Sequence, residues 1–223
     1  MIPAARRVLV LDGEQRSSLA VTRSLVRAGY AVTVTAQRAW SLAGASRGAK
    51  SHRLAADPLA DPRAYAAEIA ALAVAQHAAL VVPVTDASAD ALLSHRSLLP
   101  AGCALPFADA AVYDTASDKV IVHREALRLG IGIADSLVLD GPDGDIPADA
   151  PVFPGVIKPH RSVVGGSAKR RTSVQFVDNR DDCRRKLAAL DPLAFPVLVQ
   201  RRIHGPGEGI FVARWNGRSI ARF

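Results

Sequence analysis

The sequence from Val156 to Lys169 reads VIKPHRSVVGGSAK, and the interpretation of the second half of the chain depends on this stretch. A short apolar run of strand length ends in Lys158, and a loop with paired glycines precedes another strand-like run. Lysine is a point charge that suits a phosphate, and glycines let backbone N–H groups surround an anion. The GxxxxGK[ST] pattern of a Walker A loop is absent, and no helix follows. The stretch therefore predicts either a phosphate-binding flap or an exposed hairpin with an incidental lysine.

Short apolar runs of strand length surround this stretch. They cover Val152–Lys158, Ser173–Val177, Val197–Arg201, Gly209–Trp215 and Ser219–Phe223. The last two are joined by Asn216-Gly217, the strongest short signal for a two-residue hairpin. Helical patterns cover Ser117–Leu129 and Asp181–Leu190. Residues 112–223 are therefore predicted to form an α+β unit with mostly antiparallel strands.

The first half of the chain has a different pattern, in which strands and helices alternate. Strands are predicted at Arg7–Leu11, Ala31–Thr35 and Leu80–Val84, and helices at Ser17–Ala28 and Asp61–Ala75. This alternation is typical of βαβ units and a parallel sheet. We therefore expect an α/β protein with a parallel domain at residues 1–111 and a separate unit at residues 112–223, with the boundary near residues 110–116.

Polar side chains follow two of the predicted parallel strands. Asp12 and Glu14 come after the first strand, and Thr85 and Asp86 come after another. The first turn contains one glycine instead of the GxGxxG pattern, so dinucleotide binding is disfavoured. These residues are interpreted either as helix caps, with a serine capping the first helix and Asp86 or Ser88 the later one, or as ligand-facing loops at the carboxyl edge of the sheet.

Composition excludes several classes of protein. The net charge of +7 is divided as +3 over residues 1–111 and +4 over residues 112–223, and the one basic run lies at 169–171, so nucleic-acid binding is disfavoured. No apolar run reaches the roughly 18 residues of a membrane span, and the N-terminus lacks the pattern of a secretory signal. Cys103 and Cys183 lie far apart, without a CxxC or histidine cluster. A cytoplasmic protein without a disulfide framework or zinc site is expected.

Two further motifs accompany the lysine-bearing stretch. Asp118-Lys119 opens the predicted helix of the second half, and residues 197–203, VLVQRRI, form an apolar strand with a polar end, followed by GPGEG. This order resembles the ATP-grasp superfamily, in particular its carboxylate–amine ligase and carbamoyl-phosphate-synthase-like branch. The resemblance covers nearly the whole chain. It implies a pre-ATP-grasp domain followed by an ATP-grasp portion that is incomplete at its C-terminus.

The resemblance implies a set of nucleotide-binding residues. Lys119 and Lys158 would contact the phosphates of ATP, and residues 161–169 would form the flap over them. Residues 200–203 would form the adenine hinge through backbone groups of its last two residues, with Gln200 where the family often has an acidic residue. Glu208 would lie on the ribose or phosphate side. The implied set is Lys119, Lys158, Arg161, Gly165, Gly166, Ser167, Lys169, Gln200, Arg202, Ile203 and Glu208.

The reaction implied for a complete relative is the ligation of a small-molecule carboxylate to an amine. ATP would convert the carboxylate to an acyl phosphate, and Mg²⁺ would assist, but its ligands in the family lie beyond the matched region. Residues 1–223 alone are therefore expected to bind nucleotide weakly and to show little catalysis, and no catalytic or metal-binding residue is assigned. An unpaired strand edge near Gly209–Phe223 predicts self-association. The alternative interpretation is a non-catalytic ligand-binding or interaction module that presents Asp12, Glu14, Thr85 and Asp86.

Overall fold

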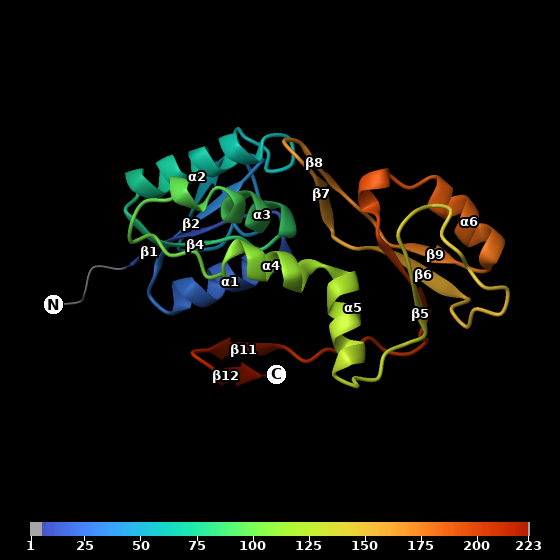
Figure 1. Cartoon of the computed structure of the whole chain (residues 1–223). Helices are drawn as coiled ribbons and strands as arrows, with labels where there is room; N and C mark the ends of the chain where they lie inside the picture. Colours follow the sequence, from blue (N-terminus) through green and yellow to red (C-terminus); the bar gives the residue numbers. More distant parts are fainter. Residues whose placement is uncertain (1–5, 223) are drawn as a thin grey trace.

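The computed structural model describes residues 6–222, which form two sheet-containing units linked by helices (Figure 1). The first unit has a four-stranded parallel sheet in the order β3-β2-β1-β4. Its strands are β1 (Arg7–Val10), β2 (Ala31–Ala36), β3 (Ala49–Arg53) and β4 (Ala78–Val82). Its helices are α1 (Arg16–Arg27), α2 (Pro62–Ala75), α3 (Asp86–Ser94) and the short 3-10 helix η1 (Arg96–Leu98). The predicted parallel α/β unit is confirmed.

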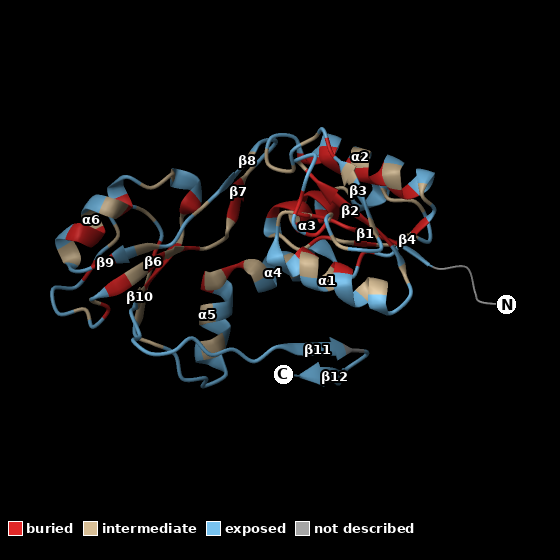
Figure 2. Cartoon of the chain, turned by 180° about the vertical axis from the view of Figure 1, so that it is seen from behind, coloured by how far each residue is buried: buried red, intermediate tan, exposed pale blue. Residues whose placement is uncertain are grey.

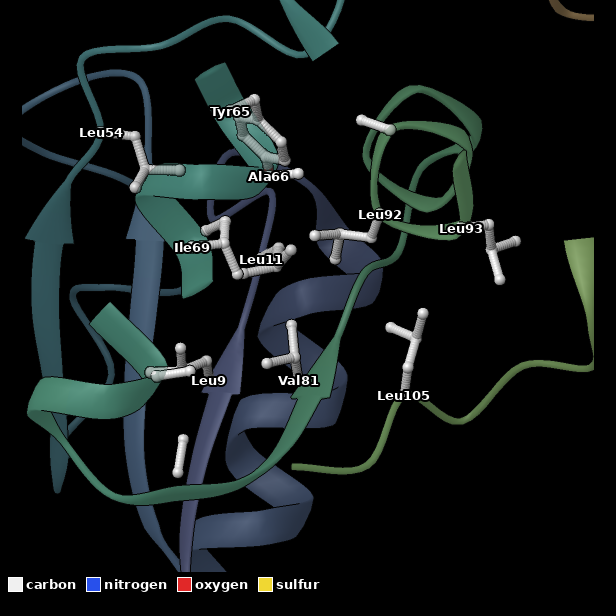
Figure 3. Close-up of a cluster of buried hydrophobic side chains, with 13 residues drawn as sticks. Leu9, Leu11, Leu54, Tyr65, Ala66, Ile69, Val81, Leu92, Leu93 and Leu105 are labelled. Carbon is white, nitrogen blue, oxygen red and sulfur yellow. The ribbon is translucent and has the colours of Figure 1, made fainter. Parts of the chain in front are cut away.

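The central strand β1 supplies residues to two cores, one on each face of the sheet. Leu9 and Leu11 pack with Ile69 of α2, in the cluster drawn in Figure 3. Val8 and Val10 lie on the opposite face, which α1 covers. Because side chains alternate along a strand, the four consecutive apolar residues at positions 8–11 serve both helix layers.

The second unit has a four-stranded antiparallel sheet in the order β5-β10-β6-β9. Its strands are β5 (Ser136–Leu139), β6 (Gly155–Pro159), β9 (Gln175–Val177) and β10 (Val197–Arg201), with helix α6 (Arg180–Ala188) and the 3-10 helix η2 (Pro192–Ala194). Ile157, Val197 and Val199 pack with Cys183 and Leu187 of α6 to form the core of this unit. The predicted change from parallel to antiparallel strands is confirmed.

Two small hairpins extend from the second unit. One is formed by β7 (Val163–Gly165) and β8 (Lys169–Arg171), and the other by β11 (Val212–Trp215) and β12 (Arg218–Arg222). Asn216 and Gly217 form the two-residue turn of the second hairpin with φ of 48° and 75°, as the sequence predicted. Phe223, the last residue of the predicted strand, lies outside the described residues. The described residues of this second hairpin are exposed along its length (Figure 2).

Helices α4 (Ala110–Ser117) and α5 (Lys119–Arg128) connect the two units. Helix α4 lies across the region expected to hold the domain boundary, and the division at residues 111 and 112 stays a prediction. Among the described residues, no helix is long and apolar enough to cross a membrane.

The capping predicted for the first helix is wrong. Helix α1 begins after Gln15, which provides no side-chain cap. Ser18 is instead buried inside the helix, and its Oγ lies 2.7 Å from the carbonyl oxygens of both Leu11 and Asp12. Its hydroxyl therefore satisfies the backbone at the carboxyl end of β1.

The cap of helix α3 also differs from the prediction. Thr85, rather than Asp86 or Ser88, is the N-cap residue, and its hydroxyl accepts from the Ser88 N–H. Asp61 is the N-cap of α2, and its side chain accepts from the Ala64 N–H at 2.8 Å.

Candidate nucleotide-binding site

Lys158 lies on β6, beside Gln200 on the neighbouring strand β10. Its Nζ donates to Gln200 Oε1 at 2.7 Å, and Gln200 Nε2 donates to Ser136 Oγ of β5 at 3.0 Å. This row of side chains crosses three strands. It lies on the face opposite the core, because the next residue along β6 toward the N-terminus, Ile157, is buried against that core. Gln200 therefore fixes the direction of the Lys158 ammonium group without neutralising its charge.

Helix α5 places Lys119 beside the residues that follow β6. Asp118 is the N-cap, and its Oδ1 accepts from the N–H groups of Val120 and Ile121 at 2.9 and 3.0 Å. Its Oδ2 lies 2.9 Å from His160 Nδ1, and the Lys119 N–H donates to the His160 carbonyl at 2.8 Å. The N-terminus of α5 is thereby fastened to the end of β6.

These contacts lower the pKa of the Asp118 carboxyl group. Burial acts to raise its pKa, but the hydrogen bonds from His160, Ile121 and Val120 outweigh burial and hold the pKa below its ordinary value. Asp118 is thus a charged cap at neutral pH, and its carboxylate is bound by backbone N–H groups of α5 and by His160.

The positive charges of Lys119 and Lys158 act on one another. Burial lowers the pKa of Lys119, Asp86 and Asp118 oppose that effect, and the positive charge of Lys158 lowers it further. Lys119 Nζ lies 3.5 Å from Ser162 Oγ, and neither lysine forms an ion pair with a carboxylate within residues 6–222. Asp86 and Asp118 offset part of the charge of Lys119, but two half-buried cations that form no ion pair still favour an anion.

The flap predicted at residues 161–169 is the β7–β8 hairpin and its turn. Gly165 has φ of 119°, and a side chain there would meet the Ala168 carbonyl oxygen at 2.4 Å, so the turn requires glycine. The flap has an apolar anchor, because Val163 and Val164 are buried. The short β7–β8 hairpin was not predicted as a pair of strands, because the glycines and serines within this stretch indicate a loop.

Ion pairs hold the flap against the first unit. Lys169 Nζ lies 2.7 Å from Asp90 of α3, and its N–H donates to the Leu59 carbonyl, also at 2.7 Å. Arg161 Nη2 donates to Asp114 of α4 at 2.7 Å. The tip residues Gly166 and Ser167 line a pocket beside the start of α2 and the end of α3. The flap therefore lies along the first unit, and contacts of its side chains with a phosphate stay a prediction.

The predicted hinge leaves β10 after Arg201. The Arg202 N–H donates to the Pro154 carbonyl at 2.8 Å, and its guanidinium lies 4.9 Å from the centre of the Phe176 ring. The N–H of Ile203 makes no backbone hydrogen bond within the described chain. Ile203 and Glu208 are exposed in an irregular segment before β11. An adenine base would thus find the Arg202 carbonyl and the Ile203 N–H available, but not the Arg202 N–H.

Two polar residues of this site were missed by sequence reasoning. His160 follows Lys158 by two residues within the quoted stretch, and this spacing was the one signal for it. Ser136 had none, because β5 was not recognised among the turn-rich residues around it. Strand β3 was also missed, because its sequence, AKSHR, has no apolar run.

The site lacks a metal-ligand set among the described residues. Within residues 6–222 no group of three or more His, Cys, Asp or Glu side chains is arranged as a metal-ligand set. The described residues therefore do not fit a Mg²⁺ site.

The arrangement of the two units matches several solved enzymes. L-Amino acid ligase from Bacillus licheniformis superposes with a TM-score of 0.62 at 14% identity, over 90% of this chain and 45% of that one. The fold is that of the ATP-grasp enzymes. The chain also matches N5-carboxyaminoimidazole ribonucleotide synthetase from Thermotoga maritima, with a TM-score of 0.55 and 14% identity over 89% of this chain and 46% of that one.

A third match was solved with a bound nucleotide. Carboxyaminoimidazole ribonucleotide synthase from Aspergillus clavatus, complexed with ATP, has a TM-score of 0.52 and 18% identity over 90% of this chain and 48% of that one. The chain spans about half the length of the solved structures it matches. No protein-family model matches the sequence, and no curated protein matches it significantly.

Proposed function

We propose that residues 112–223 form the nucleotide-binding portion of an ATP-grasp-type ligase and that residues 1–111 form its pre-ATP-grasp domain. The observation that supports this best is that Lys119 and Lys158, which lie on two different elements, form no ion pair with a carboxylate within residues 6–222, while the charge of Lys158 acts on Lys119. Similar folds crystallised with ADP or ATP support the choice of nucleotide.

Each polar residue has a role in this proposal. Lys119 and Lys158 bind the phosphate oxygens through charge-assisted hydrogen bonds. Gln200 orients Lys158, and the Asp118 cap with His160 fixes the start of α5 so that Lys119 faces the same anion. The Arg202 carbonyl and the Ile203 N–H bind the edge of the adenine, and the flap carries Arg161 and Lys169.

The proposed chemistry is a two-step ligation. A carboxylate oxygen attacks the γ-phosphorus of ATP, the bond to the bridging oxygen of ADP breaks, and an acyl phosphate forms. The amine nitrogen then attacks the acyl carbon, phosphate leaves with the bonding electrons, and the amine loses a proton. Positioning and charge neutralisation dominate catalysis of phosphoryl transfer. The part proposed for this chain is binding and positioning, with the catalytic residues unassigned.

Isothermal calorimetry with ATP, ADP and adenosine tests this proposal on the unmodified protein. We expect ATP and ADP to bind and adenosine to bind more weakly, because adenosine lacks the phosphates that the lysines would contact. A folded protein that binds all three equally, or none of them, would contradict the proposal.

A second candidate function is an interaction module, and two observations favour it. Helices α4 and α5 line an apolar groove of about 950 Å³ that includes Val112, Ile121 and Leu129. The β11–β12 hairpin also exposes Ile220 beside a strand edge, which offers backbone groups to an identical strand of a second copy. Sedimentation velocity at increasing concentration tests this: a growing dimer fraction supports it, and a monomer at high concentration contradicts it.

A further inference from the structure

The basic and acidic residues of the first unit are divided between the two sides of its sheet. Residues 6–53 contain nine lysines and arginines and two carboxylates, Asp12 and Glu14, whereas residues 54–111 contain two against six. The basic segment supplies α1, and the acidic segment supplies α2 and α3, which cover the opposite face of the sheet (Figure 1). The charge that is spread along the sequence is therefore separated by the fold into a basic side and an acidic side.

Three arginines form a row along α1. Arg16, Arg23 and Arg27 are all exposed, and their separations of seven and eleven residues are close to whole numbers of helical turns. They therefore share one face of the helix over about 17 Å, at 1.5 Å per residue. Ser18 and Thr22 are the buried residues of α1 and lie on its other face. The row is thus on the solvent side of the helix.

The segment between β2 and β3 lies alongside α1. The Ala43 N–H donates at 2.8 Å to the carbonyl of Gly13, which lies in the turn before α1. At the other end of the segment, a Cβ atom on Gly48 would meet Val26 Cγ1, in the last turn of α1, at 2.9 Å. Residues early in the segment are therefore close to the start of α1, and residues late in it are close to the end of the helix.

This segment adds two side chains to the row. Arg47 is exposed beside the end of α1, and Trp40 is 72% exposed toward its start. Arg47 and the three arginines of the row form no ion pair with any other residue of the described chain. We call these four arginines and Trp40 the α1 strip. It combines four unneutralised guanidinium groups with one exposed indole ring.

The chemistry of the α1 strip favours a chain of phosphates over other anionic partners. A guanidinium group matches the geometry of a phosphate, and a row of them can contact successive phosphates of one chain. An exposed aromatic ring offers a face on which an unpaired base can stack. A lipid surface is less suitable, because α1 exposes no large apolar side chain and carries Ser17, Ala20 and Ser24 between its arginines.

We propose that the α1 strip binds a single-stranded nucleic acid. The phosphates lie along the arginines, and one base stacks on the indole ring of Trp40. The small residues between the arginines leave room for the sugar-phosphate backbone to approach the helix. Phosphate contacts and stacking do not read base edges, so the binding has little sequence preference. The net charge of each half of the chain disfavoured nucleic-acid binding, but the fold concentrates the arginines on one side.

Fluorescence anisotropy with labelled oligonucleotides of fifteen uridines or fifteen thymidines tests the class of ligand, at roughly 50 to 200 mM salt. We expect binding that weakens with salt, with a slope of log K against log salt of about −3, from roughly 0.7 for each of four phosphate contacts. A duplex of the same length should bind more weakly, because its bases are not free to stack. No binding of either oligonucleotide by the folded protein would overturn the proposal, as would tighter binding of the duplex, of phosphatidylglycerol vesicles or of polyglutamate.

Matched variants test the location. Arg23→Glu reverses one charge of the α1 strip, and Arg63→Glu is its control, because Arg63 is an exposed arginine of α2 that forms no ion pair within residues 6–222. We expect Arg23→Glu to weaken oligonucleotide binding roughly tenfold or more and the control to change it less than about twofold. Equal losses in the two variants would overturn the location.

A third variant tests the stacking contact. Trp40→Ala should weaken oligonucleotide binding about fivefold or more, since stacking of one base contributes about 1–3 kcal/mol. Heparin, a polyanion without bases, should bind this variant and the unmodified protein equally. An unchanged affinity for the oligonucleotide, or an equal loss of affinity for heparin, would contradict the stacking of a base on Trp40.

One more comparison separates the α1 strip from the proposed nucleotide site. Lys158→Ala is expected to weaken ATP binding and to leave oligonucleotide binding unchanged, and Arg23→Glu is expected to do the reverse. If the oligonucleotide binds while ATP does not bind the unmodified protein, the ligase proposal fails and the α1 strip stands. If ATP binds and neither oligonucleotide does, or if Lys158→Ala abolishes oligonucleotide binding, the proposal for the α1 strip fails.

Discussion

Two groups of lysines in this protein differ in what surrounds their ammonium groups. Lys169 and Lys186 each lie 2.7 Å from a carboxylate, on Asp90 and Asp182, and their charges are balanced within the fold. Lys119 and Lys158 contact a hydroxyl and an amide, and their positive charges act on each other. The first group stabilises the arrangement of elements, whereas the second leaves positive charge available to a ligand. A lysine's partner, rather than its place in a motif, distinguishes the two roles.

The largest effect is expected when both unpaired lysines are removed. The double variant Lys119→Ala/Lys158→Ala should weaken ATP binding by about a hundredfold or more, because each charge-assisted contact contributes about 1.5–3 kcal/mol. Fluorescence titration with a labelled ATP analogue measures this. Lys186→Ala, in which an ion-paired lysine of α6 is lost, is the matched control and should retain the affinity. If the control and the double variant lose the same affinity, the distinction between the two groups is not valid.

A smaller effect is expected at the cap that positions Lys119. Asp118→Asn keeps an oxygen that accepts from the backbone of α5 but loses the charged partner of His160, so it should lower the free energy of unfolding at pH 7 by about 1 kcal/mol. The pKa of Asp118 lies below its ordinary value in the folded protein. The charge therefore stabilises the fold above the pKa of the unfolded state, and this contribution is lost as the pH falls through the folded pKa.

Urea unfolding of the unmodified protein and of Asp118→Asn at pH 7 and at pH 3 measures this effect. The difference in stability between the two proteins should narrow at the lower pH. A difference that stays constant or grows on acidification would show that the charge of Asp118 does not contribute.

The smallest effect on nucleotide affinity is expected for a lysine that is already paired. Lys169→Ala removes the contact between the flap and Asp90, so amide hydrogen exchange at residues 161–170 should become faster while ATP affinity changes by no more than about threefold. Hydrogen exchange followed by mass spectrometry measures the flap, and Lys186→Ala is again the control. If Lys169→Ala weakens ATP binding as strongly as the loss of Lys158, Lys169 belongs to the ligand-binding group.

The sequence predicted the general arrangement of the fold well, for a physical reason. Apolar runs such as Val197–Arg201 and the Asn216-Gly217 turn are local signals, and local signals determine where strands and turns form. Strand β3 was missed because it is short, polar and formed by pairing with β2, which is a tertiary effect. Strand β5 was missed because residues 140–145 around it have a strong turn composition.

The candidate site was predicted less completely, because contacts between distant residues decide it. Lys158, Gln200 and Lys119 were identified by their motifs, but their hydrogen bonds join residues about forty positions apart, and no local pattern predicts them. The ion pair of Lys169 with Asp90 likewise joins the two halves of the chain.

Calorimetry of ATP and adenosine with the unmodified protein and with Lys158→Ala tests the central claim most directly. Lys158 would contact only the phosphates, and adenosine would use the backbone of the hinge. We expect the variant to bind ATP roughly tenfold to a hundredfold more weakly, because one charge-assisted contact is lost, and to bind adenosine with unchanged affinity. Equal ATP affinity in the two folded proteins would contradict the assignment of Lys158 to the phosphate site.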